Sequence, residues 1–214
     1  MQENIKGVIL KTMDYKEKDK LMWVFTEQYG KISVICKAVR SPKNKYQSLI
    51  RPLLFGDFQL YRGKTMYSFN EGMVISSFSK LSTSLELLTY GSYYVELIDI
   101  VAFDGDAQPD LYETLVSALY LLESEAIEMS LLTLAYEVKI LSLTGIYVGR
   151  EAIPFKISER AVNIIEFLKK TPLPKIQVLK LDETTIKEVK TATSYLMNES
   201  FQRKPKSLKF LEYM

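Results

Sequence analysis

The spacing of apolar residues changes once along this 214-residue chain, at about residue 80. Before that position, short apolar runs alternate with polar residues at the period of two that is typical of β-strands. After it, apolar residues recur every three or four positions, as on one face of a helix. The change predicts an α+β chain, with one domain of strands over residues 1–80 and an all-helical domain over residues 81–214.

The first 80 residues predict a small antiparallel barrel. The clearest strand covers residues 31–38, where apolar and polar side chains alternate and the lysines share one side. Further strands are expected at residues 8–12, 21–26, 53–61, 65–69 and 73–78. Such short strands leave no room for crossover helices, so they pair antiparallel, and a closed barrel leaves no sheet edge exposed. An OB-fold fits this pattern, and an SH3-like barrel remains an alternative.

The rest of the chain predicts helices, each with an apolar face and with residues that favour helix ends. Residues 83–86 fit a capping box, Asp110 and Glu113 are candidate caps of the second helix, and Ser158 is a candidate cap of the fourth. Gly145 is expected to end the third helix and Thr171-Pro172 the fourth. The apolar faces lie within residues 87–101, 111–122, 131–141, 161–168 and 186–197, with a short last helix at 206–214.

The residue types that the chain lacks exclude most catalytic classes. It has no histidine and one cysteine, Cys36. It therefore has no Ser-His-Asp or Cys-His nucleophile, no imidazole ligand, no intrachain disulfide and no paired-cysteine zinc site. It also has no GxxxxGK(S/T) or GxGxxG loop. We expect no enzymatic activity and no cofactor, and we expect Cys36 to be a buried structural thiol.

Acidic residues gather in one short segment, at Asp104, Asp106 and Asp110. Calcium sites use such spacings, but the EF-hand pattern is absent. A loop that connects two helices explains this segment better than a metal site does.

The sequence indicates a cytoplasmic protein. The first residues lack the basic start, apolar stretch and cleavage site of a signal peptide. The most apolar window, residues 130–148, contains Glu137 and Lys139, so it predicts a buried amphipathic helix and not a membrane span. A chain with one cysteine needs no oxidising compartment.

Charge is distributed very unevenly along the chain. Residues 1–80 hold 14 Lys and Arg against 7 Asp and Glu, a net +7. Residues 81–150 hold 2 against 11, a net −9, and residues 151–214 hold 12 against 8, a net +4. A strongly basic N-terminal part suggests an acidic partner, and nucleic acid is the obvious one.

The polar segment after the clearest strand is the strongest local signal for nucleic acid. Phosphates need cations, and single-stranded bases need flat rings on which to stack. The alternative is an ordinary solvated loop. The candidate contacts in this segment are Lys37, Arg40, Lys43, Lys45 and Arg51; the secondary candidates are Lys11, Lys16, Lys18, Lys20, Lys31, Arg62 and Lys64; the stacking candidates are Tyr15, Tyr46, Tyr61 and Tyr67.

Two further regions bear on this interpretation. Trp23 lies in an apolar strand and is expected in the core. The sequence leaves three roles open for the cations near the C-terminus: they extend a nucleic-acid track, they bind an acidic peptide, or they only favour solubility. These cations are Lys175, Lys180, Lys187, Lys190, Arg203, Lys204, Lys206 and Lys209.

Several short segments follow one another in a fixed order near the start of the chain. They are Gly7-Val8-Ile9-Leu10-Lys11-Thr12, Tyr15-Lys16-Glu17-Lys18-Asp19-Lys20-Leu21, Phe25-Thr26, Tyr29-Gly30-Lys31-Ile32 and Lys37-Ala38-Val39-Arg40. A further segment near the end is Lys206-Ser207-Leu208-Lys209-Phe210-Leu211. The first segments closely resemble the opening of the RecO family, and the last is similar to the close of that family. The order and spacing of the segments are specific, although no one of them is.

The resemblance implies a bacterial recombination mediator in DNA repair, with an OB barrel followed by a helical domain, that is nucleoid-associated and is not an enzyme. RecO proteins bind single- and double-stranded DNA, anneal complementary strands and work with RecR. They help RecA replace the single-stranded-DNA-binding protein, whose acidic C-terminal tail they bind. By resemblance, the family's basic loop matches Lys37, Arg40, Lys43 and Lys45.

The chain departs from the family at one place. Many members carry a four-cysteine zinc motif after the third long helix, whereas residues 145–155 here contain no cysteine. We therefore do not expect zinc, and any role that the zinc motif plays in other members is not carried over to this chain.

Three hypotheses follow for the function. The first is the DNA-binding mediator. The second is a protein-interaction adaptor that uses the barrel as a docking platform, which intact partner binding without DNA binding would favour. The third is a small RNA-binding barrel protein, which a preference for single-stranded RNA would favour. Which surface binds protein partners is not evident from the sequence.

Overall fold

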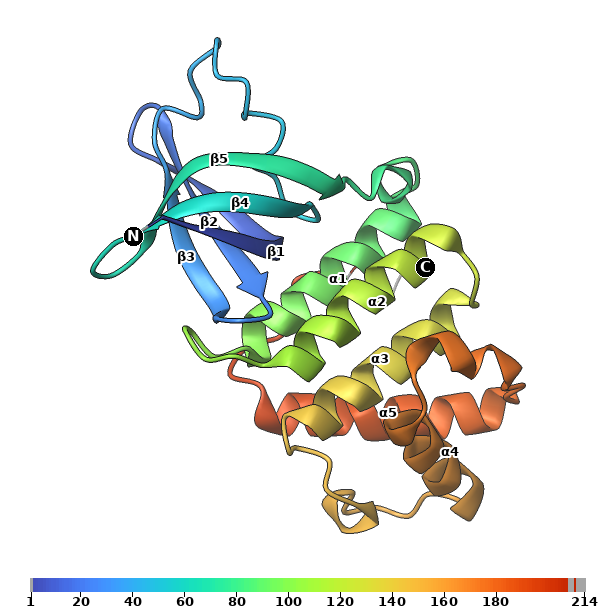
Figure 1. The fold of residues 1–214 in the computed structure, drawn as a ribbon. Coiled ribbons are helices and arrows are strands. Elements are labelled where there is room, and N and C mark those ends of the chain that lie inside the picture. Colours follow the sequence, from blue (N-terminus) through green and yellow to red (C-terminus); the bar gives the residue numbers. More distant parts are fainter. Residues whose placement is uncertain (1, 208–209, 211–214) are drawn as a thin grey trace.

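A computed structural model describes residues 2–207 and 210 and contains a β-barrel followed by helices (Figure 1). The strands are β1 (Gln2–Tyr15), β2 (Asp19–Thr26), β3 (Gly30–Cys36), β4 (Phe55–Arg62) and β5 (Tyr67–Ser76). The helices are α1 (Leu85–Val101), α2 (Pro109–Ser124), α3 (Met129–Leu143), α4 (Glu159–Lys170) and α5 (Glu183–Ser200). Short 3-10 helices lie at Ser79–Ser82, Arg150–Ala152 and Leu173–Val178. The change of period near residue 80 therefore coincides with the change from strands to helices.

The barrel closes in the order β1-β2-β3-β5-β4, and β4 returns to β1. Neighbouring strands are antiparallel, except that β3 and β5 are parallel and pair only through Val34↔Tyr67 and Ile35↔Ser68. The long β1 serves both sides because it pairs with β2 and with β4. This closed five-stranded barrel fits the OB-fold and confirms the predicted fold class.

Two details of the predicted strands are wrong. Residues 65–69 and 73–78 do not form separate strands, because β5 continues through Asn70-Glu71-Gly72 with β4 as its partner. Gly72 allows this pairing, since a Cβ at that position would lie 3.1 Å from the ring of Phe58. The charged segment 14–20 is mostly strand, and the turn covers only residues 16–18.

The barrel interior follows from the alternation in the strands. In β3 every second residue is buried, from Gly30 to Cys36. These side chains join those of the other strands in an apolar cluster that fills the barrel. Its buried members are Ile5, Ile9, Met22, Val24, Ile32, Val34, Cys36, Val39, Leu49, Ile50, Leu54, Phe58, Leu60 and Tyr67. Burial raises the pKa of the Cys36 thiol to about 12, which makes it an inert thiol, as predicted.

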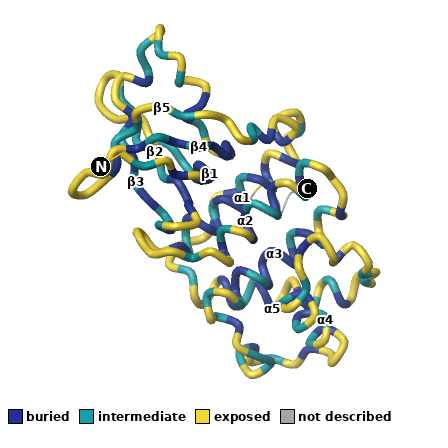
Figure 2. Tube along the Cα trace, viewed as in Figure 1, coloured by how far each residue is buried: buried dark blue, intermediate teal, exposed yellow. Residues whose placement is uncertain are grey.

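A second apolar cluster joins the outside of the barrel to the helices. Helices α1 and α2 lie against the barrel, and α3 to α5 lie beyond them (Figure 1). Figure 2 shows the buried positions that run from the strands into α1 to α3. The barrel contributes Val8, Leu10, Phe25, Leu53, Phe55 and Phe78 to this cluster. One side of the barrel is therefore covered by helices.

The helix ends follow the sequence signals in part. Ser84 and Ser158 cap α1 and α4 as N-cap side chains, the first one residue later than a capping box from Thr83 requires. Gln108 precedes α2, whose first residue is Pro109, so Asp110 and Glu113 lie inside the helix and the predicted caps are wrong. The predicted last helix, residues 206–214, lies largely outside the described residues.

Candidate nucleic-acid interface

Residues 37–54, here called the basic loop, connect β3 to β4 (Figure 1). The loop begins at the end of the barrel far from the helices and returns to the helix side, where Leu53 joins the apolar cluster of the helices. The loop consists of turns, and Val39, Leu49 and Ile50 anchor it because they are buried in the barrel core. Lys37 lies just before Val39, and Lys43 and Lys45 lie between Val39 and Leu49; all three lysines are exposed. The apolar anchors thus hold a polar segment in place without a helix or strand of its own.

Arg40 ties the basic loop to the turn between β1 and β2. Its guanidinium donates to the carbonyl oxygens of Lys16 at 3.4 Å and Glu17 at 3.1 Å, and pairs with the Asp14 carboxylate at 3.2 Å. Its backbone N–H donates to the carbonyl oxygen of Lys18 at 2.9 Å. Arg40 therefore acts first as a clamp, and it brings the cations of the β1–β2 turn next to those of the loop.

The lysines of these two segments differ from Arg40 in their partners. Lys16 and Lys18 are exposed in the turn, and Lys20 is half-buried at the start of β2. Among the described residues, no carboxylate pairs with these three lysines or with Lys37 and Lys43. Their charge is thus available to an external anion.

Lys45 and Tyr46 form the other edge of the basic loop. The Lys45 ammonium lies 4.9 Å from the centre of the Tyr46 ring, which packs edge-on against Phe69 at 5.2 Å. Both line an open hollow of about 350 Å³ on the outer face of β1, β4 and β5, together with Asn4, Asp57, Gln59, Glu71, Gly72 and Met73. A cation beside an aromatic ring suits a nucleotide, although the two carboxylates of this hollow do not favour phosphate.

Arg51 holds the end of the basic loop in place. Its guanidinium donates to the carbonyl oxygen of Ser77 at 2.8 Å, next to the end of β5. Arg62 and Lys64 are exposed in the turn between β4 and β5, which Figure 1 shows well away from the basic loop. These three cations are therefore not part of the group around Lys37.

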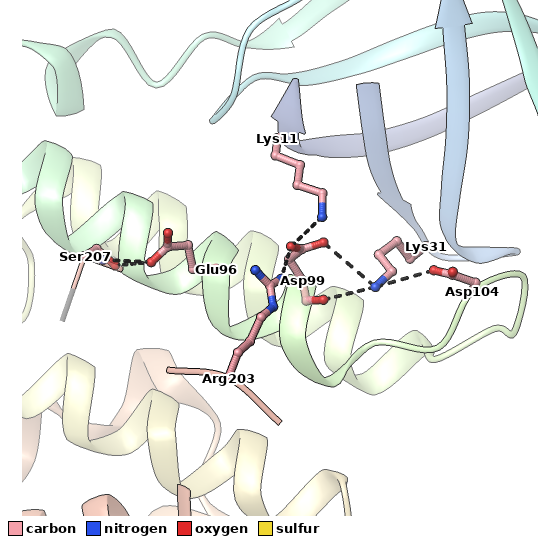
Figure 3. Close-up of polar contacts among 7 residues, drawn as sticks. All are labelled: Lys11, Lys31, Glu96, Asp99, Asp104, Arg203 and Ser207. Atoms are coloured by element: carbon pink, nitrogen blue, oxygen red, sulfur yellow. Dashed lines mark hydrogen bonds and ion pairs between the residues drawn. The ribbon is translucent and has the colours of Figure 1, made fainter. Parts of the chain in front are cut away.

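Lys11 and Lys31 lie at the junction of the barrel and the helices, around Asp99 of α1 (Figure 3). The Lys11 ammonium is 2.8 Å from the Asp99 carboxylate, and the Lys31 ammonium is 3.8 Å away. Lys31 also donates to the Asp99 carbonyl oxygen at 3.0 Å and lies 3.4 Å from Asp104. Arg203, from the segment after α5, pairs with the same carboxylate. We call these four residues (Lys11, Lys31, Asp99 and Arg203) the Asp99 cluster.

Asp99 is 7% exposed. Burial acts to raise the pKa of its carboxyl group, but hydrogen bonds from Lys11 and Arg203 and the charge of Lys31 outweigh burial and lower the pKa. Asp99 is thus an anion that holds cations from β1, β3 and the C-terminal segment together. The same segment contacts α1 again, where the Ser207 hydroxyl and N–H donate to Glu96 at 2.6 and 2.9 Å (Figure 3).

The four tyrosines proposed for stacking occupy different environments. Tyr15 and Tyr61 are 38% and 44% exposed. Tyr46 is half-buried beside Lys45. Tyr67 is buried in the barrel core with its ring 6.3 Å from that of Tyr29, so it offers no free face to a base.

Sequence reasoning missed Trp23. The expectation that it lies in the core is wrong, since Trp23 is half-buried on the outer face of β2, with the Lys11 ammonium 4.8 Å from its ring centre. The alternation contained the signal, because Met22 and Val24 are fully buried and Trp23 points to the opposite face.

The segment that follows α3 is organised by hydrogen bonds. The Arg150 guanidinium donates to the carbonyl oxygens of Ile153 at 2.5 Å and Phe155 at 2.7 Å. Tyr147 is buried, and its hydroxyl donates to Glu166 at 2.9 Å. Within residues 2–207 and 210, no three Asp, Glu or Cys side chains are placed to hold a metal ion. No helix in this part of the chain is long and apolar enough to cross a membrane.

Comparison with known proteins gives matches to both parts of the chain. Residues 1–78 match the family model described as Recombination protein O N terminal, and residues 82–149 match Recombination protein O C terminal. The chain is 37% identical to the DNA repair protein RecO of Clostridium perfringens (strain 13 / Type A), over 97% of this chain and 96% of the relative. It is 32% identical to that of Clostridium novyi (strain NT), over 98% and 93%, and 30% identical to that of Clostridium acetobutylicum, over 96% and 95%.

Proposed function

The chain belongs to the RecO family of DNA repair proteins, which are not enzymes, and we propose that it binds single- and double-stranded DNA through the basic loop and anneals complementary strands. One observation carries this proposal. The exposed Lys37 and Lys43 lie with Lys16 and Lys18 at one end of the barrel, and none of these lysines forms an ion pair with a carboxylate among the described residues.

These lysines are suited to hold the phosphate backbone without reading the bases. Lysine is a point charge that contacts phosphates in any sequence, and phosphate contacts carry no sequence information. Neutralised strands repel each other less, so two complementary strands approach and pair without ATP. Release of counterions supplies much of the binding free energy, and binding therefore weakens steeply as salt rises. Tyr46 beside Lys45 and Tyr15 beside Lys16 are the nearest rings for unpaired bases.

An annealing assay tests the proposal. Two complementary oligonucleotides coated with single-stranded-DNA-binding protein are mixed with the protein, without nucleotide, at low and high salt. We expect faster annealing at low salt, and loss of that effect in the triple variant Lys37→Gln, Lys43→Gln, Lys45→Gln. Arg40 is kept in this variant because it clamps the β1–β2 turn.

The matched control removes the same charge elsewhere. Lys156, Arg160 and Lys170 are exposed in the helical part of the chain and are not among the C-terminal cations considered for a nucleic-acid track. Their triple replacement by Gln should leave annealing close to that of the unmodified protein. Equal loss in both variants would show a general effect of net charge and contradict a role for the basic loop.

We also propose that the protein works with RecR, binds the acidic tail of the single-stranded-DNA-binding protein and helps RecA load onto DNA coated with that protein, in the cytoplasm at the nucleoid. Family membership supports these partners. Pull-down with RecR, and with the tail peptide, tests them in the triple variant as well. Partner binding that persists while the unmodified protein binds no DNA would favour an adaptor, and tighter binding to single-stranded RNA would favour an RNA-binding protein.

A further inference from the structure

Trp23 is the only tryptophan of the chain, and its position is unusual for a half-buried aromatic residue. It packs against neither of the two apolar clusters formed by residues 2–207 and 210, although Tyr46, Phe69 and Tyr112 all do. Its contact on the barrel surface is the Lys11 ammonium, 4.8 Å from the ring centre. The indole therefore lies outside both apolar cores.

The residues around Trp23 form an apolar strip on the outside of β1, β2 and β3. In register, Trp23 lies opposite Lys11 on β1 and Ser33 on β3, and the next outward-facing row pairs Leu21 with Met13 and with Ile35. Met13 is 51% exposed, and Leu21 and Ile35 are half-buried, and none of the three packs into a core of the described chain. We call Met13, Leu21, Trp23, Ser33 and Ile35 the outer strip.

Cations border the outer strip at both of its ends. At the helix end, Lys11 and Arg203 of the Asp99 cluster are about half-exposed, with side chains 43% and 52% accessible. At the other end, Lys16 and Lys18 lie in the β1–β2 turn next to Lys37. Lys11 and Lys16 are five residues apart in the chain, so these two groups are separated by about 16 Å along the strand.

We propose that the outer strip is a base-stacking site for single-stranded nucleic acid, in which a base stacks on Trp23 and the flanking phosphates contact Lys11 and Arg203. The inference rests on the proposed DNA binding and deepens it. An aromatic face between two groups of cations fits a chain that carries both bases and phosphates. Lys11 and Arg203 remain about half-exposed beside Asp99, and Lys16 and Lys18 pair with no carboxylate among the described residues, so charge complementarity favours a polyanion over an apolar protein surface. Paired bases cannot reach the indole, so duplex DNA should use the basic loop alone.

Tryptophan fluorescence tests this inference directly, because the signal comes from one residue. A single-stranded oligonucleotide with bases and an abasic strand of equal length are added to the full-length protein. Fluorescence anisotropy of a dye on each strand reports binding independently of the indole. We expect saturable quenching with the base-containing strand and much weaker quenching with the abasic strand when both are bound.

The variants separate stacking from structure. Trp23→Leu should weaken single-strand binding about tenfold, the scale of one stacked base, and leave duplex binding within about twofold. Trp23→Phe keeps an aromatic face and should restore most of the affinity. Lys11→Gln and Arg203→Gln should each lower the salt slope of single-strand binding by about one.

Two matched controls are available in the helical part of the chain. Phe167→Leu removes a ring that is 37% exposed, and Lys156→Gln removes an exposed charge. Each should change single-strand affinity less than about twofold. Thermal unfolding of every variant identifies those that fail to fold.

Four results would overturn the inference, and they are distinguishable from failure of the proposed function. Anisotropy that reports binding without a change in Trp23 fluorescence would leave DNA binding intact but remove the outer strip from it. Equal quenching by the bound abasic strand would show that the indole senses phosphate and not a base. If Trp23→Leu weakened duplex binding as much as single-strand binding, the indole would have a structural role.

Quenching that grows with protein concentration in the absence of DNA would show that the outer strip binds a second copy of this chain. Absence of binding by anisotropy would instead refute the proposed function.

Discussion

Two buried carboxylates, one at the junction and one in the helical part, are equally hidden from solvent and behave in opposite ways. Asp99 and Glu137 are each 7% exposed. Asp99 is surrounded by cations, which lower its pKa. Glu137 accepts hydrogen bonds from the hydroxyls of Tyr93 at 2.7 Å and Thr193 at 2.6 Å, and burial raises its pKa because those bonds only partly offset it. For two equally buried acids, the partners therefore decide in which direction the pKa shifts.

The difference separates the roles of the two regions. The Asp99 cluster joins the barrel, α1 and the C-terminal segment through charge, which is a connection that an external anion can compete for. The Glu137 group joins α1, α3 and α5 through hydrogen bonds from two hydroxyl groups inside an apolar core. Substitutions of Asp99 and Glu137, and changes of pH, should therefore affect stability in different ways.

Asp99→Ala should give the largest effect, a loss of about 3 kcal/mol in the free energy of unfolding. That value is the low end of the range for breaking a buried ion pair. Without Asp99, the half-exposed side chains of Lys11 and Arg203 can be solvated by water, whereas the less accessible Lys31 side chain cannot easily be solvated. Urea unfolding measures it. Asp104→Ala removes an exposed partner of Lys31, with 79% of the side chain accessible, and should change stability little. Equal effects of the two substitutions would contradict the special role of Asp99.

Asp99→Asn should cost about 2 kcal/mol at neutral pH, because charged hydrogen bonds become neutral ones. A carboxyl group whose pKa is lowered by folding contributes stability above its unfolded pKa, near about 4, and loses it as pH falls toward the lowered folded value. The difference between the unmodified protein and Asp99→Asn should therefore shrink below about pH 4. Unfolding free energies across pH measure this, and a difference that does not depend on pH would refute the ion-pair explanation.

Glu137→Gln should have the opposite sign and a smaller size, a gain of about 1 kcal/mol at neutral pH, because a neutral amide is cheaper to bury than a carboxylate. The raised pKa means that the carboxyl group costs no stability below its unfolded pKa, and that the cost grows as pH rises to the folded value. The gain should thus disappear in acid. Destabilisation by Glu137→Gln at neutral pH would show that the carboxylate itself is needed.

A metal chelator should have no effect. Neither carboxylate belongs to a group of ligands among the described residues, and Arg150 and Tyr147 hold the segment after α3 by hydrogen bonds. We expect EDTA to leave the thermal midpoint unchanged and added zinc not to raise it. A fall in the midpoint with EDTA would show that a metal ion contributes to the fold.

Local signals in the sequence predicted much of the fold. The period of two in residues 31–38 gives β3 with every second side chain buried, and Ser84 and Ser158 cap helices. Local pattern failed where two signals overlapped. In β2, consecutive apolar residues hid the face of Trp23, and Pro109 placed the start of α2 ahead of Asp110. The two-domain division at residue 80 stays a prediction. Barrel residues such as Phe25 pack in the same apolar cluster as the helices, so the two parts share a core.

The candidate site was less predictable because its geometry depends on distant partners. Lys11, Lys31 and Lys37 are alike in the sequence, yet only Lys37 lies in the basic loop. Asp99 engages the first two, and it lies 88 and 68 residues away from them in the chain. Arg40 was predicted as a DNA contact, and its clamp on the β1–β2 turn was not foreseen because it depends on how two loops meet. Its contact with DNA stays a prediction.

The Asp99 cluster also has a consequence for the order of folding. Asp99 is 88 residues from Lys11 and 104 from Arg203, so these contacts require both the barrel and the last segment to be in place. Contacts that close such long loops form late, because the entropy of closure is paid before they contribute. Asp99→Asn should therefore speed unfolding and leave the refolding rate nearly unchanged. Stopped-flow measurements of both rates test this expectation. The Asp99 cluster would then set the unfolding rate, and with it the lifetime of the folded chain.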